Sequence, residues 1–357
     1  MATRAKKKPG QLSKAAAIAH AVNSALGTTS VKLGNDPQFE IVRIPTGSLT
    51  LDRITGGGLA LGRHVEIYGD ESACKSYVAY RTMALAQGRG KLCAIIDPEH
   101  SFDGDWFDHL GGRSNELLTQ HPENAEEAIA VIMALAKLAK DNPLEIITID
   151  SVASLIPTEE TVKDPREEDR IAAQARMMSR ALRRITAVNR RVLFLWTNQE
   201  RTNIGVSFGS PRTTSGGRAL RFYATTRIEL RRGGMEKAKR RVAAKGNIVE
   251  RELPVARWIQ CRVEKDKSTR PYREGSFLFD SDIGAIDESS EIINLGLEDE
   301  IISRIGNSFI YEDVDGKEWK GVSSRFSKWL REDEQLRDEL VAVIEDNTVQ
   351  GAGYGAH

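Results

Sequence analysis

The feature that most constrains the fold of this chain is a short loop between an apolar run and a helical stretch. The loop reads Gly69-Asp-Glu-Ser-Ala-Cys-Lys75-Ser76, and it lies between residues 65–68 and residues 77–86. In a strand–loop–helix unit, backbone N–H groups and the helix N-terminus hold polyphosphate, a lysine pairs with the β- and γ-phosphates, and a serine binds Mg²⁺. We therefore predict a nucleotide site made of Gly69, Asp70, Glu71, Ser72, Ala73, Cys74, Lys75 and Ser76.

One residue of this loop departs from the phosphate-binding pattern GxxxxGK[ST]. Cys74 stands where the pattern has its second glycine. A tight anion-binding turn does not readily admit a side chain, so we expect Cys74 to weaken nucleotide binding or turnover. A thiol beside a helix N-terminus and Lys75 should also have a lowered pKa. Taken alone, the loop is also compatible with a turn that caps an ordinary helix.

Two acidic residues at strand ends strengthen the nucleotide interpretation. Residues 144–149 form an apolar run typical of a buried parallel strand and end in Asp150, which we expect to bind Mg²⁺ through water. Asp150 as a helix N-cap is the alternative. Residues 91–96 form a second such run, and Glu99 just beyond it is a candidate general base for the water that attacks the γ-phosphate. Together with the loop, these strand ends predict an ATPase that uses ATP and Mg²⁺.

The composition limits the size of the hydrophobic core and the classes of partner and location that we expect. With 357 residues, 40% of them hydrophobic and 29% charged, the chain can build one substantial core and a smaller domain. Lys and Arg together number 51, as do Asp and Glu, so any nucleic-acid contact must come from local clustering. Cys74, Cys93 and Cys261 have no CxxC spacing, and we expect them to be reduced, without zinc or disulfide. No run approaches 18 apolar residues, so we expect no membrane span and a cytoplasmic location.

Strand-like and helical patterns alternate from Gly47 to about Leu230, which predicts an α/β fold with a mainly parallel, doubly wound sheet. The expected strands are 63–68, 91–96, 144–149, 191–197, 224–230 and 257–264, and the expected helices are 73–87, 124–140 and 171–189. We expect residues 1–12 to form a basic, disordered leader. In segment 13–45, Ser13 caps a helix over 14–26 whose apolar stripe requires a partner. The ATPase core spans 46–284, a C-terminal α/β domain 285–346 with a helical stretch over 323–344, and a flexible tail 347–357.

Two segments of the core are candidates for nucleic-acid binding. Segment 157–170 is highly charged, and segment 200–217 mixes Gly, Thr and Arg with large apolar residues. A loop this long in a compact domain is usually functional, although a disordered surface excursion is the alternative. We expect arginines to neutralise phosphates, glycine N–H groups to assist, and apolar side chains to separate bases. The residues concerned are Arg176, Arg201, Ile204, Phe208, Arg212, Gly216 and Gly217.

Several strings closely resemble the bacterial RecA recombinases. They are residues 46–52, 62–69, 95–100, 175–183, 197–201 and 204–224, and the resemblance covers about 13–345. It implies a RecA-like P-loop ATPase core with an N-terminal oligomerisation helix and a small C-terminal domain. It also implies an ATP-dependent recombinase that polymerises as a helical filament on single-stranded DNA and catalyses homologous pairing and strand exchange with double-stranded DNA. Loading or mediator proteins are further possible partners.

The resemblance also implies roles for single residues. Asp103 and Trp106 match the positions that contact and stack the adenine, and Gln199 matches the γ-phosphate sensor. Lys265 and Lys267 match a pair that reaches across the protomer interface to the neighbour's ATP. Segments 157–170 and 200–217 match the family's DNA-binding loops, and Ile171 and Ile204 match the positions whose side chains wedge between stacked bases.

Three departures from the family pattern leave alternatives open. Cys74 favours a catalytically weak protein that coats DNA with little hydrolysis, whereas Glu99 opposes it. Segment 157–170 is richer in acid than the family's loop and lacks its glycines, and segment 231–245 is longer and more basic than the family's hairpin. This last segment is either an extra DNA contact or a solvated turn. Such divergence suits a phage-encoded or accessory member, and a hexameric helicase is disfavoured by the base-wedging loop.

Overall fold

The structure, a computed structural model, describes residues 13–158, 167–189, 191–202, 212–244 and 247–352. The chain divides into two compact units, residues 1–42 and 43–357. In the first unit, helix α1 (Lys14–Leu26) forms as predicted, with the Ser13 hydroxyl accepting the Ala16 N–H at 3.1 Å and Gly27 closing the helix in a left-handed conformation. A short 3-10 turn, η1 (Pro37–Phe39), follows. Ile18 and Leu26 are 65% and 72% exposed, so the unit leaves the apolar stripe of α1 uncovered.

The second unit is built on one large sheet with the strand order β12-β11-β10-β9-β3-β7-β6-β4-β5. The strands from β9 to β5 in that order are all parallel, and β10, β11 and β12 extend the sheet in antiparallel fashion. The predicted mainly parallel α/β sheet is therefore confirmed. The strands are β3 (His64–Gly69), β4 (Leu92–Ile96), β5 (Leu117–Gln120), β6 (Leu144–Ile149), β7 (Leu193–Thr202), β9 (Thr226–Ala244), β10 (Asn247–Asp266), β11 (Glu274–Asp280) and β12 (Ala285–Ile286).

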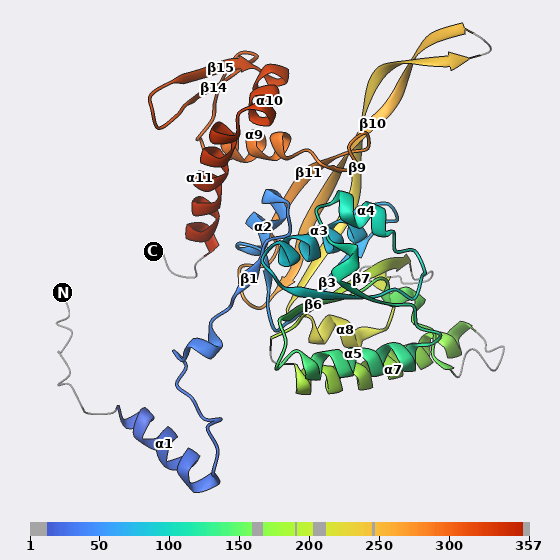
Figure 1. Ribbon diagram of the computed structural model, residues 1–357, viewed down its shortest axis with the longest axis vertical. Coiled ribbons are helices and arrows are strands. Elements are labelled where there is room, and N and C mark those ends of the chain that lie inside the picture. Colours follow the sequence, from blue (N-terminus) through green and yellow to red (C-terminus); the bar gives the residue numbers. More distant parts are fainter. Residues whose placement is uncertain (1–12, 159–166, 190, 203–211, 245–246, 353–357) are drawn as a thin grey trace. The chain divides into compact units, whose positions relative to one another are not determined.

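Helices cover both faces of the parallel part of the sheet (Figure 1). Ile146 of β6 belongs to a core cluster with α2 (Leu49–Thr55), α3 (Lys75–Gly88) and α4 (Gly104–His109), whereas Ile147 belongs to a second cluster with α5 (Ala125–Leu138), α7 (Glu167–Val188) and α8 (Arg218–Tyr223). Because successive residues of a strand face opposite sides, a strand covered on both faces reads as a continuous apolar run. This explains why the sequence revealed these strands. Short pairs complete the unit: β1 (Arg43–Ile44) with β2 (Leu59–Ala60), and β8 (Arg212–Thr214) with β7.

Four elements differ from the expected ranges. Strand β7 was expected to end at residue 197 but runs to Thr202, so the start of the predicted loop 200–217 belongs to this strand. Helix α7 begins at Glu167, so the end of the predicted loop 157–170 is helical. Strands β9 and β10 are 19 and 20 residues long, far beyond the expected 224–230 and 257–264. The described outer residues, 235–241 and 250–254, leave the sheet and are mostly exposed, so they lack the apolar pattern that marks a buried strand.

The C-terminal part contains α9 (Glu288–Glu298), β13 (Ser303–Ile305), β14 (Ser308–Glu312), β15 (Glu318–Val322), α10 (Ser323–Glu332) and α11 (Glu334–Ala352). The helical stretch expected over 323–344 is thus two helices, and Asp333 between them accepts the Leu336 N–H at 3.0 Å. The flexible tail predicted from residue 347 is wrong through residue 352, where α11 ends. Asn347 donates to Asp299 at 3.3 Å and Thr348 is 7% exposed, so packing extends the helix.

A buried carboxylate joins this C-terminal part to the core. Glu291 of α9 is 1% exposed and accepts the Ser48 hydroxyl at 2.6 Å and the Thr50 N–H at 3.0 Å. These donors lie at the N-terminus of α2, where backbone N–H groups have no partner within the helix. Glu291 therefore caps α2 from another part of the chain. In the described residues, no helix is long and apolar enough to cross a membrane.

Candidate nucleotide site and nucleic-acid interface

The predicted phosphate loop connects β3 to α3, as its sequence indicated. Strand β3 ends at Gly69, whose φ is +142° and where a Cβ would lie 1.8 Å from the Leu230 carbonyl oxygen of β9. Only glycine fits there, because β9 passes too close for any side chain. The Lys75 ammonium donates to the carbonyl oxygens of Gly69 at 3.3 Å and Asp70 at 2.5 Å, so it lies across the loop. Burial lowers the pKa of Lys75, and nearby carboxylates, that of Asp150 first, oppose the shift.

Cys74 holds a backbone conformation that disfavours a side chain. Its φ is +63° and its ψ is 23°, in the left-handed region, at the position that caps α3. The thiol packs against the core, and burial raises its pKa to about 12 although Lys75 and Arg257 oppose the shift. The expectation of a lowered pKa is therefore wrong, because desolvation of the thiolate outweighs the lysine and the helix N-terminus. The loop forms around cysteine, but in a conformation that glycine adopts more easily.

Asp150 follows β6 and lies beside the loop. It is 5% exposed, its Oδ1 accepts the Thr197 hydroxyl at 2.5 Å, and its Oδ2 is buried without a hydrogen bond among the described residues. Burial raises the pKa of Asp150, the nearby hydroxyls of Thr197 and Ser76 oppose the shift, and the Glu99 charge adds to it. A buried carboxylate oxygen without a partner, next to a serine hydroxyl, fits a hard cation such as Mg²⁺. Ser76 and Asp150 are the residues that would hold it.

No group of three or more His, Cys, Asp or Glu side chains in the described ranges could hold a metal alone. Mg²⁺ usually takes only one or two protein ligands and completes its shell with waters and substrate phosphates.

Glu99 is held by the strand end next to Asp150. Its Oε1 accepts the hydroxyls of Ser151 and of Ser154, the latter at 3.0 Å. The loop that carries Glu99 is shaped by Asp97, which is fully buried and accepts the backbone N–H groups of residues 99, 101 and 102 at 3.2, 2.8 and 2.8 Å. From the sequence, Asp97 was recognised only as the end of a strand, whereas in the structure its carboxylate positions the loop that carries Glu99.

Gln199 also reaches the same edge of the sheet. It stands on β7 directly opposite Gly69 of β3 and is half-buried. The neighbouring Asn198 is buried, and its side chain donates to Glu66 Oε1 at 2.9 Å and to the Ser215 carbonyl at 3.0 Å. Asn198 thus ties the end of segment 200–217 to the central strand, a function that sequence reasoning missed.

Asp103 and Trp106 lie together at the start of α4. The Asp103 carboxylate caps this helix by accepting the Trp106 N–H at 3.0 Å. The half-buried Trp106 indole packs 5.3 Å from the Tyr80 ring and 6.5 Å from the Tyr77 ring, measured between centroids. Since Tyr77 directly follows Ser76, the indole is anchored on the helix that begins at the phosphate loop.

Lys265 and Lys267 lie at the opposite edge of the sheet from the loop. Their stretch of β10 pairs with the start of β9 at Thr226, which lies beside the start of β3. Lys265 donates to the Arg221 and Phe222 carbonyls, and Lys267 donates to the Phe222 carbonyl at 3.4 Å. Burial, with the charges of Lys267 and Arg227, lowers the pKa of Lys265 to about 8. These lysines therefore do not face their own chain's phosphate loop.

Some of the predicted DNA-binding residues can be located. Arg176 is exposed on α7. Gly216 and Gly217 have φ of +82° and +73°, and a Cβ would lie 2.9 Å from Val152 and 2.6 Å from Ala175 respectively. The Gly216 N–H donates to Gln174 Oε1 at 3.2 Å, so it is not offered to a phosphate as we expected.

The sequence analysis did not identify Gln174 as a residue that holds segment 200–217, although its position in the sequence indicates an unusual buried polar residue. It stands one turn before Met178 on the buried face of α7, where a polar residue is unusual. Its amide also donates to the Val152 and Leu155 carbonyls, both at 3.0 Å. Ile204 and Phe208 lie outside the described residues, and so do the side chains of Ile171, Arg201 and Arg212.

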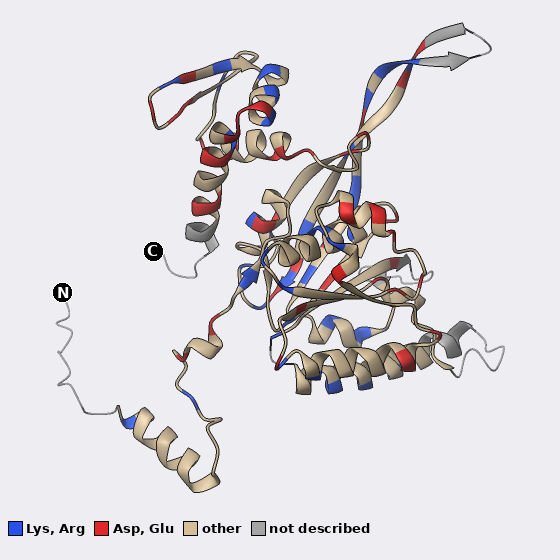
Figure 2. Ribbon diagram, in the orientation of Figure 1, with Lys and Arg blue, Asp and Glu red and all other residues tan. Residues whose placement is uncertain are grey.

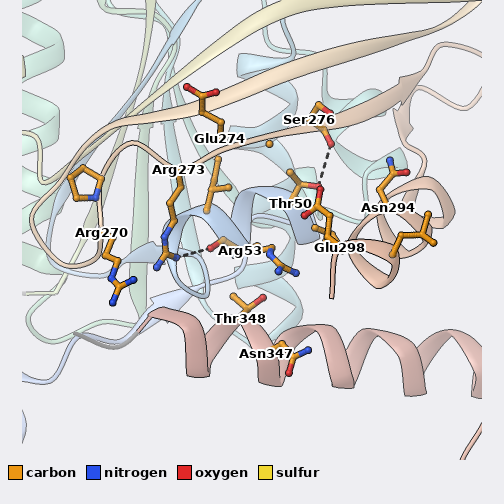
Figure 3. A pocket seen from close by; sticks show the side chains of 15 residues that line it. Thr50, Arg53, Arg270, Arg273, Glu274, Ser276, Asn294, Glu298, Asn347 and Thr348 are labelled. Carbon is orange, nitrogen blue, oxygen red and sulfur yellow. Dashed lines mark hydrogen bonds between the residues drawn. The ribbon is translucent and has the colours of Figure 1, made fainter. Parts of the chain in front are cut away.

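A pocket of about 840 Å³ lies elsewhere, between α2, β11 and the helices α9 and α11 (Figure 3). Two hydrogen bonds join residues that line it: Arg273 donates to the Arg53 carbonyl at 3.1 Å, and the Thr50 hydroxyl donates to the Ser276 carbonyl at 3.4 Å. The residues that line it include none of the predicted nucleotide-site residues.

Comparison with known proteins agrees with this geometry. The family profile of the RecA N-terminal domain matches residues 14–283. The chain is 35% identical to the Protein RecA of Rickettsia massiliae (strain Mtu5) over 341 residues, which cover 94% of this chain and 92% of that protein. It is 36% identical to the Protein RecA of Frankia alni (strain DSM 45986 / CECT 9034 / ACN14a) over 332 residues, which cover 91% of this chain and 89% of that protein.

Replacing Cys74 tests whether its backbone conformation limits the loop. We expect Cys74→Gly to stay folded and to bind ATP more tightly or turn it over faster, because glycine removes a left-handed strain of about 1–2 kcal/mol. Cys74→Ala is the matched control: it keeps the Cβ and should give no gain. Steady-state ATPase kinetics of the three proteins measure the effect, and equal kinetics for the glycine variant and the native protein would contradict it.

Proposed function

This chain belongs to the RecA family and has the recombinase function of that family in DNA repair and recombination, and we propose that it acts as an ATP-hydrolysing helical filament on single-stranded DNA. In this proposal the filament pairs its strand with homologous double-stranded DNA and exchanges strands, in the cytoplasm. The hydrolysis of ATP to ADP and phosphate changes the filament's affinity for DNA.

The observation that carries the ATPase part is the convergence of Lys75, Asp150 and Glu99. They come from β3, β6 and β4, three parallel strands whose carboxyl ends meet at one edge. Ligands bind at this edge of an open α/β sheet. In the proposed reaction Lys75 and the loop N–H groups hold the phosphates, and Ser76 with Asp150 holds Mg²⁺, which neutralises developing charge on the phosphates. Glu99 orients the attacking water and accepts its proton, and Gln199 senses the γ-phosphate.

The rest of the proposed nucleotide site rests on Trp106 and on the two lysines. Trp106 offers a flat, partly exposed indole to the adenine, with Asp103 at its side. Because Lys265 and Lys267 lie at the opposite edge of the sheet from their own loop, they suit a role on the ATP of the next copy of the chain. The DNA-binding part of the proposal includes Arg176, Gly217 and segments 157–170 and 200–217.

A catalytically weak DNA-coating protein is the alternative that Cys74 favours. The held position of Glu99, fixed by Ser151 and by the loop around Asp97, opposes it. A general base beside the phosphate loop is needed for ATP hydrolysis, whereas a protein that only coats DNA does not require one.

Replacing Glu99 tests the ATPase directly. We expect Glu99→Gln to bind ATP and single-stranded DNA but to hydrolyse ATP about 100-fold to 10,000-fold more slowly, because the amide keeps the shape and removes the base. Filaments should then persist longer. Glu123→Gln, which removes an exposed carboxylate elsewhere, is the control and should leave turnover unchanged. DNA-stimulated phosphate release at native rates in Glu99→Gln would remove this residue from the mechanism.

Replacing Lys265 tests the shared site. The Lys265→Ala variant should lose DNA-stimulated ATPase activity although its phosphate loop is intact. Mixing it with a Lys75→Ala variant should restore part of the activity, because some interfaces then combine an intact loop from one copy with an intact Lys265 from the next. The ammonium of Lys265 is charged below about pH 8, so kcat/KM for ATP should fall as the pH rises through that value.

Lys265→Arg, which stays charged, is the matched control and should not show that fall. If no mixing ratio restores activity, Lys265 and Lys267 either act on the nucleotide of their own subunit or have no role in hydrolysis.

A further inference from the structure

The ends of β9 and β10 form a pair of strands that leaves the sheet (Figure 1). We call this pair the ribbon and define it by its described residues, 235–244 and 247–256. Strand β3 pairs with β9 only as far as Leu230, and β11 pairs with β10 only from Ala256 onward. Between these points and the tip, the two strands pair with each other alone. At about 3.4 Å per residue, the ribbon extends roughly 30 Å beyond the sheet.

Specific contacts at its base fix the ribbon. Register shifts between Pro254 and Ala256 and between Arg257 and Ile259 mark bulges, which bend a strand and increase its twist. The Trp258 indole donates to Glu236 Oε1 at 3.0 Å, and Arg240 pairs with Asp282 beyond the end of β11. The ribbon is therefore held as a defined projection.

The ribbon carries more exposed cations than its own acids neutralise. Lys237, Lys239, Arg241 and Arg251 are all exposed, and in the described part of the chain none has an ion-pair partner within 4 Å. Figure 2 shows Lys and Arg recurring along the ribbon. Arg240, which pairs with Asp282, lies directly opposite Arg251 in the register. Like charges directly opposite one another destabilise a strand pair, and a second anion beside Arg251 would relieve this repulsion.

The sequence of the ribbon favours a polyanion with regular charge over other partners. A two-stranded ribbon by itself is marginally stable in water. Among the ribbon side chains that the structure describes, the large exposed apolar ones are Met235 and Leu253, at 45% and 36% exposed, which is little surface for an apolar protein interface. Residues 235–256 contain no Phe, Tyr or Trp, so they offer no platform on which unpaired bases could stack. A two-stranded ribbon does fit the major groove of duplex DNA.

We propose that the ribbon binds the phosphates of duplex DNA, through Lys237, Lys239, Arg241 and Arg251. This inference deepens the proposed function and rests on it, since the ribbon would hold the duplex with which the filament exchanges strands. It adds a surface separate from segments 157–170 and 200–217. Binding by backbone charge is independent of sequence, which suits a protein that must accept any homologous duplex.

The test compares two sets of substitutions on the same strands. One variant carries Lys237→Gln, Lys239→Gln, Arg241→Gln and Arg251→Gln, and the matched variant carries Glu250→Gln and Glu252→Gln, whose acids lie opposite Arg241 and Lys239. Binding of a fluorescent duplex is measured across salt concentrations, both to the protein alone and to filaments assembled on single-stranded DNA with a non-hydrolysable ATP analogue.

We expect the first variant to bind duplex more weakly, with the slope of log affinity against log salt reduced by about 0.9 for each phosphate that is no longer neutralised. Its ATPase stimulated by single-stranded DNA should be retained, and the matched variant should bind duplex more tightly. Unchanged duplex binding in the first variant, a similar loss in both variants, or an equal loss of single-strand binding would each overturn the proposal. Duplex binding is also measured on the protein alone, so the role of the ribbon is tested even if the native protein forms no filaments. Failure of the native protein to form filaments would contradict the proposed function and not the proposal for the ribbon.

Discussion

The parallel pairing of β3 with β7 and β9 is the constraint on which the rest of this structure depends. It places Gly69 beside Gln199 on one side and beside Leu230 on the other, and the Leu230 carbonyl leaves no room for a side chain at residue 69. The chain must therefore turn sharply into the loop and enter α3 at Lys75. The neighbouring strands β6 and β4 end at the same edge of the sheet. The pairing of the strands therefore places Asp150 and Glu99 beside this loop.

The same sheet separates the two sets of groups that we propose to act on ATP. The phosphate loop lies at the carboxyl ends of the parallel strands, whereas Lys265 and Lys267 lie at the other edge, against the end of α8. A chain with this arrangement cannot bring both sets to one nucleotide by itself. A helical polymer of identical copies solves the problem, since the same face of every copy meets the opposite face of the next. The exposed apolar residues of α1 fit such an assembly because they too require a partner.

The sequence predicted what depends on short, continuous patterns. Strands β3, β4 and β6 appeared as apolar runs because both faces of each are covered, and Lys75, Ser76 and Asp150 followed from their positions at strand ends. The lowered pKa expected for Cys74 failed because the degree of burial is a tertiary property that local sequence does not report. The polar bonds of Asn198 and Asp97 were missed for the same reason. The ribbon was underestimated because strands exposed on both faces carry no hydrophobic period.

We propose that ATP lies between two copies of the chain in a filament on single-stranded DNA, and an electron cryomicroscopy reconstruction with a non-hydrolysable ATP analogue would show whether it does. We expect a helical polymer in which the nucleotide contacts Lys75 and Ser76 of one copy and Lys265 and Lys267 of the next. Closed rings, or a filament in which these two lysines lie away from every nucleotide, would contradict it.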